Sequence, residues 1–282
     1  MSLKCRICGG EAPESAAVTA KELMYGSRDT FQYFECPVCH CLQITEIPEN
    51  LGKYYGDGYY SYQVDTPFED VSNLPKDDRP ILDVGCGAGE YLISLYNKGR
   101  TNLTGCDPYV PQEIHYPQGI HVYKKTIHEM EGTYDTIYMR DSFEHVTDPH
   151  EVFDSLKRLL SPEGMVVIQI PVYPNIAYSE FGTCWYQLDA PRHIHLFSKE
   201  ALASLARQHG LQVVKREYDS DWGQIVRSFL YKRDIPFFEQ TAEMVRTYFS
   251  ESDICAMQQL SDKANEGEIG DHARFYLKHA AS

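Results

Sequence analysis

A short apolar strand that runs through a glycine-rich turn into a helix is the feature that most restricts how this chain can fold. Residues 79–84 are mostly apolar, and residues 90–96 carry apolar side chains at helical spacing. The turn between them consists of Gly85, Cys86, Gly87, Ala88 and Gly89. Glycines there let backbone amides approach a ligand closely, because no side chain stands in the way. The pattern predicts an α/β domain with a ligand at this turn.

The residues around the turn restrict the kind of ligand. A dinucleotide fingerprint requires glycine at position 90, where this chain has Glu90, and the Gly-Lys-Ser/Thr ending of a phosphate-binding P-loop is absent. Asp83 and Glu90 place negative charge on both sides of the turn. The turn therefore favours a cationic ligand over a phosphate.

A second carboxylate follows at a characteristic distance. Residues 102–106 form another predicted strand, which ends at Asp107, a position that suits a carboxylate binding ribose hydroxyls. The acid before the glycines, the G-x-G-x-G spacing and this second acid together resemble the class I S-adenosylmethionine-dependent methyltransferases. The resemblance implies a Rossmann-like, seven-stranded core that binds S-adenosylmethionine and releases S-adenosylhomocysteine.

The resemblance continues along the chain. A third strand is predicted over residues 121–125, and a fourth, over residues 134–139, leads into Phe143-Glu144-His145-Val146, which is similar to the L-E-H-V segment of the family. The resemblance implies cofactor contacts from Asp83, Gly85, Cys86, Gly87, Gly89, Asp107, Pro108, Thr126, Ile127 and Asp141.

A long aromatic insertion over residues 171–197 follows the fifth predicted strand and should roof the acceptor pocket. Residues 185–198 resemble the W-x-x-L-D-x-P-R-H-x-x-x-F-S stretch of methyltransferases linked to sugar and glycan modification. The predicted acceptor contacts are Tyr60, Trp185, Tyr186 and Arg192. For Arg192, a bond to an anionic substrate group and a salt bridge to Asp189 both remain open.

Methyl transfer to a hydroxyl requires a group that removes a proton, and histidine suits this near neutral pH. His145 and His193 are the candidate bases, and Glu144 is placed to support one of them. A purely structural, hydrogen-bonded role for either histidine remains the alternative.

Two C-x-x-C pairs near the start of the chain form a second motif. Cys5 and Cys8, with Cys36 and Cys39, provide four thiolates at the spacing of a closed tetrahedral zinc site. A redox pair is the weaker alternative, because it requires only one C-x-x-C. The pairs predict structural zinc, and with the rest of the chain they resemble sugar methyltransferases that carry an N-terminal zinc-binding domain.

The sequence predicts four regions. These are a zinc-binding module over residues 1–48, a tyrosine-rich connector or lid over 49–78, the methyltransferase domain over 79–235 and a helical extension over 236–282. The extension has helical spacing in parts, and its pattern does not locate the last strand of the sheet.

The acidic composition restricts the partners. The formal net charge of −15 disfavours nonspecific binding to nucleic acid or to an anionic membrane. The apolar stretches are too short to span a bilayer, and we expect a cytoplasmic protein. The predicted function is methylation of a small molecule, a sugar or sugar nucleotide. The alternatives are an RNA methyltransferase that binds RNA through its zinc module, and a noncatalytic S-adenosylmethionine-binding or scaffold protein.

Overall fold

An eight-stranded sheet forms the centre of the computed structural model, which describes residues 2–55 and 63–280. Its strand order is β13-β14-β11-β10-β6-β7-β9-β8, and the five strands from β11 to β9 run parallel. The strands are β6 (Ile81–Val84), β7 (Leu103–Cys106), β8 (Ile114–His115), β9 (His121–Tyr123), β10 (Tyr134–Arg140), β11 (Leu160–Pro171), β13 (Leu211–Tyr218) and β14 (His272–His279). This arrangement confirms the predicted Rossmann-like class.

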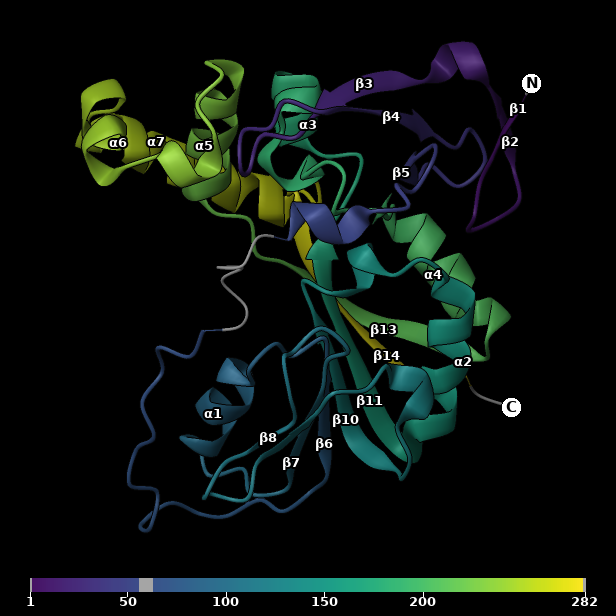
Figure 1. The fold of residues 1–282 in the computed structure, drawn as a ribbon, viewed down its shortest axis with the longest axis vertical. Helices are drawn as coiled ribbons and strands as arrows, with labels where there is room; N and C mark the ends of the chain where they lie inside the picture. The colour runs from purple at the N-terminus through teal and green to yellow at the C-terminus, as the bar shows by residue number, and fades with distance from the viewer. Residues whose placement is uncertain (1, 56–62, 281–282) are drawn as a thin grey trace.

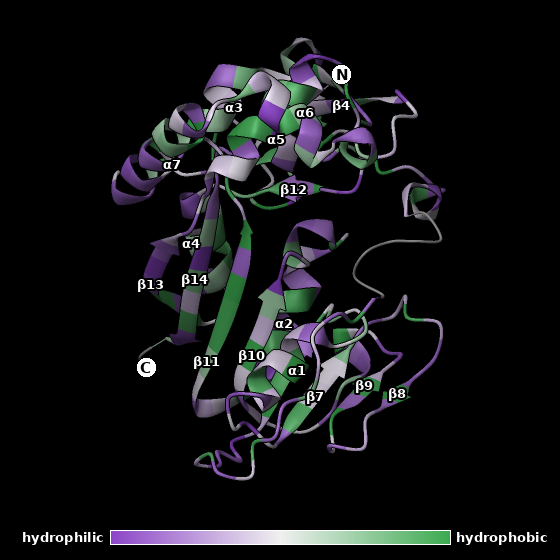
Figure 2. Ribbon diagram, turned by 90° about the vertical axis from the view of Figure 1, so that its left-hand side faces the viewer, coloured by the Kyte–Doolittle hydropathy of each residue, from purple (hydrophilic) through white to green (hydrophobic). Residues whose placement is uncertain are grey.

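Helices cover both faces of this sheet (Figure 1). Helix α1 (Glu90–Tyr96) packs on one face, and α2 (Pro149–Leu159) and α4 (Lys199–Gln208) pack on the other. Neighbouring residues of β6 show the alternation: Ile81 belongs to the cluster with α1, and Leu82 belongs to the cluster with α2 and α4. With both faces buried, the strands in the middle of the sheet are rich in apolar residues, and most of β11 is green in Figure 2.

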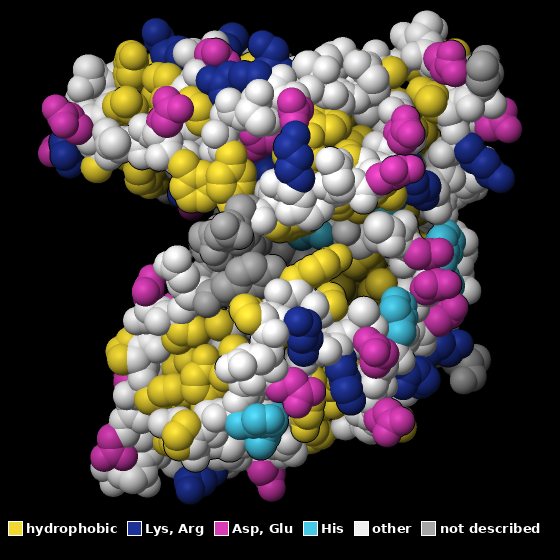
Figure 3. All heavy atoms as spheres, in the orientation of Figure 1, with side chains coloured by type: hydrophobic (Ala, Val, Ile, Leu, Met, Phe, Trp, Pro, Cys, Tyr) yellow, Lys and Arg dark blue, Asp and Glu magenta, His cyan; other side chains and the backbone are white. Residues whose placement is uncertain are grey.

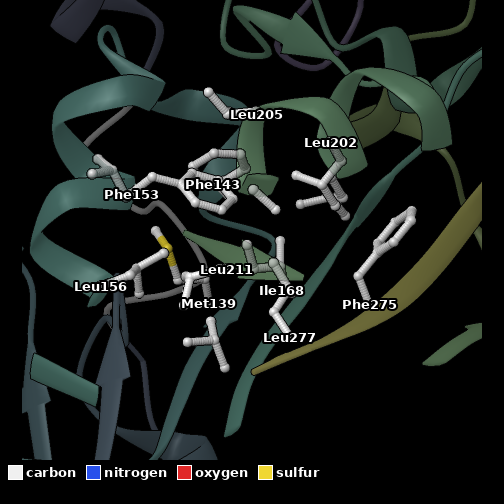
Figure 4. Packing of buried hydrophobic residues seen from close by; sticks show 14 of the residues in the cluster. Met139, Phe143, Phe153, Leu156, Ile168, Leu202, Leu205, Leu211, Phe275 and Leu277 are labelled. Carbon is white, nitrogen blue, oxygen red and sulfur yellow. The ribbon is translucent and has the colours of Figure 1, made fainter. Parts of the chain in front are cut away.

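Helix α2 begins where the sequence places its start signal. The Asp148 carboxylate accepts hydrogen bonds from the amides of His150 and Glu151 at 2.9 and 3.1 Å, with Pro149 in the first turn. The buried face of the helix presents Phe153 and Leu156, which pack near Phe143 in the main core (Figure 4). Phe143 thereby anchors the segment that carries the predicted base.

The N-terminal region is built around short strands. These are β1 (Ser2–Lys4), β2 (Glu11–Pro13), β3 (Val18–Lys21), β4 (Thr30–Glu35) and β5 (Leu42–Ile44). Strands β1 and β2 pair with each other, and β3, β4 and β5 form a second sheet. A strand from the aromatic insertion, β12 (His195–Leu196), pairs with β5 and extends this second sheet to four strands. Trp185 also shares one apolar cluster with Tyr33 and Leu42. The N-terminal region and the predicted roof therefore share a core, although the predicted boundary at residue 48 stays a prediction.

The C-terminal extension combines helices with a strand. After α5 (Trp222–Lys232), which packs against α3 (Ile176–Phe181), come α6 (Ala242–Tyr248) and α7 (Glu251–Glu266), and these helices lie above the sheet (Figure 1). The chain then returns as β14, which inserts antiparallel between β11 and β13. This is the strand that the sequence pattern does not locate. None of the helices in the described ranges is long and apolar enough to cross a membrane.

Candidate active site

A cavity of about 600 Å³ opens at the carboxyl ends of β6, β7 and β10. Figure 3 shows a waist between the upper part of the molecule and the sheet domain below it. Most of the predicted cofactor residues line the cavity, namely Asp83, Gly85, Cys86, Asp107, Pro108, Thr126, Ile127 and Asp141. The topology thus brings together residues spread over nearly 60 positions of the chain.

The glycine turn has the backbone geometry that its sequence predicts. Gly85, Gly87 and Gly89 all have positive φ angles, of 70°, 53° and 92°. A Cβ atom on Gly85 would lie 2.6 Å from the Cβ atom of Ser142, which follows β10. The turn therefore requires glycine both for its conformation and for its close contact with the next strand.

We expect Gly85→Ala to weaken S-adenosylhomocysteine binding about tenfold or more, because relieving the clash displaces the turn, and to lower stability by about 1–2 kcal/mol through left-handed strain. Gly119→Ala is the matched control, because Gly119 also has a positive φ angle (87°), but a Cβ atom there would meet none of the described residues within 4 Å. The control should lose similar stability and keep its affinity. Equal affinities for the two variants, measured by calorimetry, would contradict this account of the turn.

Two buried carboxylates flank the turn. Asp107 is 7% exposed and accepts hydrogen bonds from the amides of Gly87 (3.0 Å) and Tyr109 (2.8 Å), which fix its orientation. Burial raises the pKa of Asp83 to about 7, although the positive charge of Arg140 opposes the shift. A cationic ligand would favour the ionised form of Asp83, whereas a phosphate would oppose it. The carboxylates therefore fit a sulfonium nucleoside.

His145 lies beside this cavity with one ring nitrogen engaged. It ends a short 3₁₀ turn (Phe143–His145) after β10, and its Nδ1 lies 2.9 Å from the carbonyl oxygen of Arg192. A carbonyl can only accept, so Nδ1 carries the proton and Nε2 keeps its lone pair. Burial lowers the pKa of His145 to about 4. The ring is neutral at neutral pH and can accept a proton.

His193 approaches His145 from the aromatic insertion, with ring centroids 4.8 Å apart. Its Nδ1 donates to the carbonyl oxygen of Gln187 at 2.7 Å, which leaves Nε2 as the basic nitrogen. Burial lowers the pKa of His193, and the negative charge of Asp189 partly offsets this. The structure thus brings the two predicted bases together in the same protonation state.

Glu144 is the third member of this group. Its side chain is fully buried, and neither carboxylate oxygen has a hydrogen-bond partner within residues 2–55 and 63–280. Burial, reinforced by the negative charge of Asp141, raises the pKa of Glu144 well above its usual range. Its Oε1 lies 3.8 Å from Nε2 of His193. This separation is longer than a hydrogen bond, so the neutral carboxyl of Glu144 lies next to that nitrogen without bonding it.

Two predicted acceptor contacts are structural in this arrangement. The Arg192 side chain has no exposed surface, and it bonds Asp189 (2.8 Å), Glu22 (3.1 Å) and the carbonyl of Tyr54 (2.9 Å). Trp185 is 1% exposed and donates to Asp271 at 2.9 Å. In this structure both side chains are buried and bonded within the chain, and contact of either with an acceptor stays a prediction. Of the two roles left open for Arg192, the structure shows the salt bridge.

The other two predicted acceptor contacts are Tyr186 and Tyr60. Tyr186 is half-buried, and the guanidinium of Arg227 lies 4.8 Å from its ring. Burial raises the pKa of its hydroxyl to about 12, and the positive charge of Arg227 opposes this shift. Tyr60 lies outside the described residues.

Some residues of the site carry no sequence signal. The Tyr55 hydroxyl lies 3.2 Å from Nδ1 of His145, and its ring stacks on Tyr109. Tyr55 belongs to a tyrosine-rich segment whose composition does not single out one member. His272, which bonds Asp141 in the cavity wall, comes from the C-terminal region, where no motif marks it. Only the tertiary arrangement identifies Tyr55 and His272.

The four predicted zinc ligands also meet. The sulfur atoms of Cys5, Cys8, Cys36 and Cys39 all lie within 4.8 Å of one another, with pairs at 3.6 and 3.5 Å. A tetrahedral ion with Zn–S bonds of about 2.3 Å requires S–S separations of about 3.8 Å. Amides of Ile7, Gly10 and Val38 each donate to one of these sulfurs at 3.4 Å. The donor set fits zinc, with no open position for a substrate.

Comparisons with known proteins agree with this geometry. The family described as "Methyltransferase domain" matches residues 57–216. The C-methyltransferase NovU of Streptomyces niveus is 32% identical over 250 residues, which cover 75% of this chain and 56% of that protein. The ubiquinone biosynthesis O-methyltransferase of Pseudomonas aeruginosa (strain UCBPP-PA14) is 29% identical over 152 residues, or 48% of this chain and 65% of that protein.

The chain is also similar to a relative that is named for a different acceptor and to solved structures. A tRNA U34 carboxymethyltransferase of Syntrophotalea carbinolica is 32% identical over 34% of this chain and 33% of its own length. The cyclopropane synthase MmaA2 of Mycobacterium tuberculosis superimposes with a TM-score of 0.44 and 16% identity, covering 73% of this chain and 79% of that one. The chain thus spans between a third and two thirds of the length of these curated relatives.

Proposed function

The chain belongs to the class I S-adenosylmethionine-dependent methyltransferases, and on that premise we propose that it methylates a small acceptor, a sugar or sugar nucleotide. One observation carries the proposal. The acid-flanked glycine turn and His145 line one cavity, and the His193 ring lies 4.8 Å from the His145 ring, so a methyl donor and a proton acceptor can meet there.

The donor end of the cavity supports binding of S-adenosylmethionine, whose sulfonium supplies an activated methyl group when bound. Asp107 would hold the ribose hydroxyls, because its carboxylate is already oriented by two backbone amides. Thr126 and Ile127 line the far wall of the cavity and would flank the adenine ring. Asp83 and Asp141 would provide negative charge near the cationic portion.

The histidine pair supports proton removal from the acceptor. Both rings are anchored through Nδ1 on backbone carbonyl oxygens, so both Nε2 atoms keep lone pairs. His193 would take the acceptor proton, and Glu144, 3.8 Å away and neutral, would offer its carbonyl oxygen to the N–H that forms on the ring. His145 would position the acceptor or serve as the base for a different proton. The same arrangement suits proton removal from oxygen or from an activated carbon.

The acceptor side favours an anionic sugar derivative. Arg227 stacks on Tyr186 (4.8 Å) and Phe237 (5.3 Å), and it forms no ion pair within the described part of the chain. An unneutralised guanidinium is notable in a chain of net charge −15. A guanidinium beside two aromatic rings suits a phosphate with an attached ring system. This supports a sugar nucleotide over a neutral sugar.

The zinc site would stabilise the fold and take no part in the chemistry. Its four thiolates form a closed set, and the sheet that follows it includes β12, two residues beyond His193. Zinc held there would therefore stabilise the roof that carries the candidate base.

Methyl transfer assays with labelled donor test the proposed function. We expect transfer to at least one sugar nucleotide, no transfer to RNA, and loss of transfer in Asp107→Asn. Transfer to RNA that diminishes with salt would favour the RNA methyltransferase alternative. Absence of transfer to every acceptor class, with S-adenosylmethionine bound tightly, would favour the noncatalytic alternative.

We expect Arg227→Gln to raise the KM for a sugar nucleotide about tenfold and to leave the KM for S-adenosylmethionine unchanged, because one charge-assisted contact is lost. Arg233→Gln is the matched control, since Arg233 also stacks on two aromatic rings, Phe229 and Tyr248. Steady-state kinetics with both substrates varied checks this. An equal effect of the two substitutions would contradict the assigned role.

A further inference from the structure

His272, the first residue of β14, lies at the edge of the sheet where the cavity opens. Strand β14 runs antiparallel to β11, so its first residue pairs with Pro171, the last residue of β11. The carboxyl ends of the parallel strands meet at that same edge. The side chain of His272 is 7% exposed. A residue near the C-terminus thereby lies next to the loop that follows β10.

Both ring nitrogens of His272 face carboxylates. Nε2 lies 2.8 Å from Oδ1 of Asp141, and Nδ1 lies 2.7 Å from Oδ1 of Asp219. Ionised carboxylates can only accept hydrogen bonds, so both nitrogens carry protons and the ring is an imidazolium. Burial alone would lower the pKa of His272, but the two carboxylate hydrogen bonds raise it to about 10. The positive charge therefore persists at neutral pH.

The two carboxylates differ in their other partners. Asp219 also accepts from the side-chain amide Nε2 of Gln169 (2.8 Å) and from the guanidinium of Arg274 (3.3 Å). Asp141 lines the cavity and has a positive φ angle of 48°. In the part of the chain that the structure describes, its side-chain hydrogen bond is the one from His272. The orientation of the Asp141 carboxylate therefore depends on His272, whereas other side chains also hold the Asp219 carboxylate.

We infer that His272 is a positioning residue that holds the Asp141 carboxylate fixed and ionised in the wall of the cavity. The inference rests on the proposed function, in which this wall binds the cationic portion of S-adenosylmethionine. Asp141 uses Oδ1 for His272 and keeps Oδ2 for a ligand. About half of the Asp141 side chain is exposed; partial desolvation of the carboxylate acts to raise its pKa, but the hydrogen bond from His272 brings the pKa below the usual value.

The charges around His272 are balanced within a small region. Arg140 on β10 and Arg274 on β14 add positive charge, whereas Asp141 and Asp219 carry the negative charges and the raised pKa of Glu144 keeps that carboxyl neutral. His193 also acts on Asp141. Removing the imidazolium would leave the Asp141 carboxylate without its hydrogen-bond donor and its closest positive charge. We therefore expect the loss of His272 to affect ligand binding through Asp141.

The first test measures S-adenosylhomocysteine affinity by calorimetry in the full chain. We expect His272→Gln to weaken binding about tenfold or more, as for the loss of a hydrogen bond to a charged group. Asp141→Asn should give a similar loss, and the double variant should lose no more than either single one. His279→Gln, at the other end of the same strand, should bind as the wild type does.

The second test observes the ring directly by nitrogen-15 NMR of histidine-labelled protein. The His272 signal, assigned by its absence in His272→Gln, should report two protonated nitrogens from pH 7 to about pH 9. If the wild type binds S-adenosylhomocysteine but His272 is neutral at pH 7.5, or the two single losses simply add, the inference is overturned. If the wild type does not bind the ligand at all, the proposed function itself fails.

Discussion

Replacing His193 with glutamine should lower kcat for methyl transfer by roughly 10²–10⁴-fold, the usual contribution of a positioned general base. Glutamine keeps a polar side chain of similar reach but cannot accept a proton at neutral pH. Affinity for S-adenosylhomocysteine should change less than about threefold, because His193 does not line the cosubstrate cavity. Rapid-quench or steady-state kinetics, combined with calorimetry, separates the two effects.

His115→Gln is the matched control, since this histidine is exposed on the edge strand β8. It should retain full turnover. His145→Gln should also lower kcat. The histidine whose replacement lowers kcat more is the main base. Unchanged turnover in both the His145 and His193 variants would remove the pair as bases and leave them the structural role.

The pH dependence provides a second test of the histidine pair. Burial lowers the pKa of His145 to about 4, so its proton-accepting form persists as the pH falls through the ordinary histidine range near 6.5. Activity limited by this ring should therefore decline only below about pH 5. A decline centred on pH 6.5, with the protein still folded, would contradict a buried neutral base.

The second large effect is expected at the zinc site. Structural zinc in small domains contributes about 10–16 kcal/mol of apparent binding free energy, which is comparable to the whole stability of an ordinary domain. Cys36→Ser removes a fully buried ligand and should abolish zinc binding. Because β12 pairs with β5, disorder should spread to the roof segment around His193. We expect a large drop in Tm and loss of turnover together.

Elemental analysis and thermal unfolding of reduced, untagged protein check this prediction. Cys255→Ser is the control, since that cysteine is exposed on α7 and should leave one zinc per chain. A metal content near zero in the wild type would refute the zinc assignment. Full zinc content in Cys36→Ser would show that the ligand set is different.

The sequence predicts the donor half of the site better than the acceptor half, for a physical reason. The donor residues lie in one strand-turn-helix unit and at the ends of the next strands, so local pattern and sheet topology place them together. Asp83, Gly85 and Asp107 meet in the cavity for that reason. The four cysteines follow the same logic, because metal geometry restricts their spacing.

The acceptor half depends on contacts between distant segments. Arg192 resembles a substrate ligand in its motif, but Glu22 and Tyr54 from the N-terminal region enclose it. Its role is decided by partners about 140 and 170 positions away along the chain. His272 gains its charge from Asp141 and Asp219, which the pairing of β14 brings to it. No local pattern contains that information.

The central claim is that the acid-flanked glycine turn binds a positively charged sulfur nucleoside, and isothermal calorimetry of the purified chain tests it most directly. We predict one binding event per chain for S-adenosylmethionine and for S-adenosylhomocysteine, and none for NAD⁺. Heat from NAD⁺ with none from either sulfur nucleoside would contradict the account.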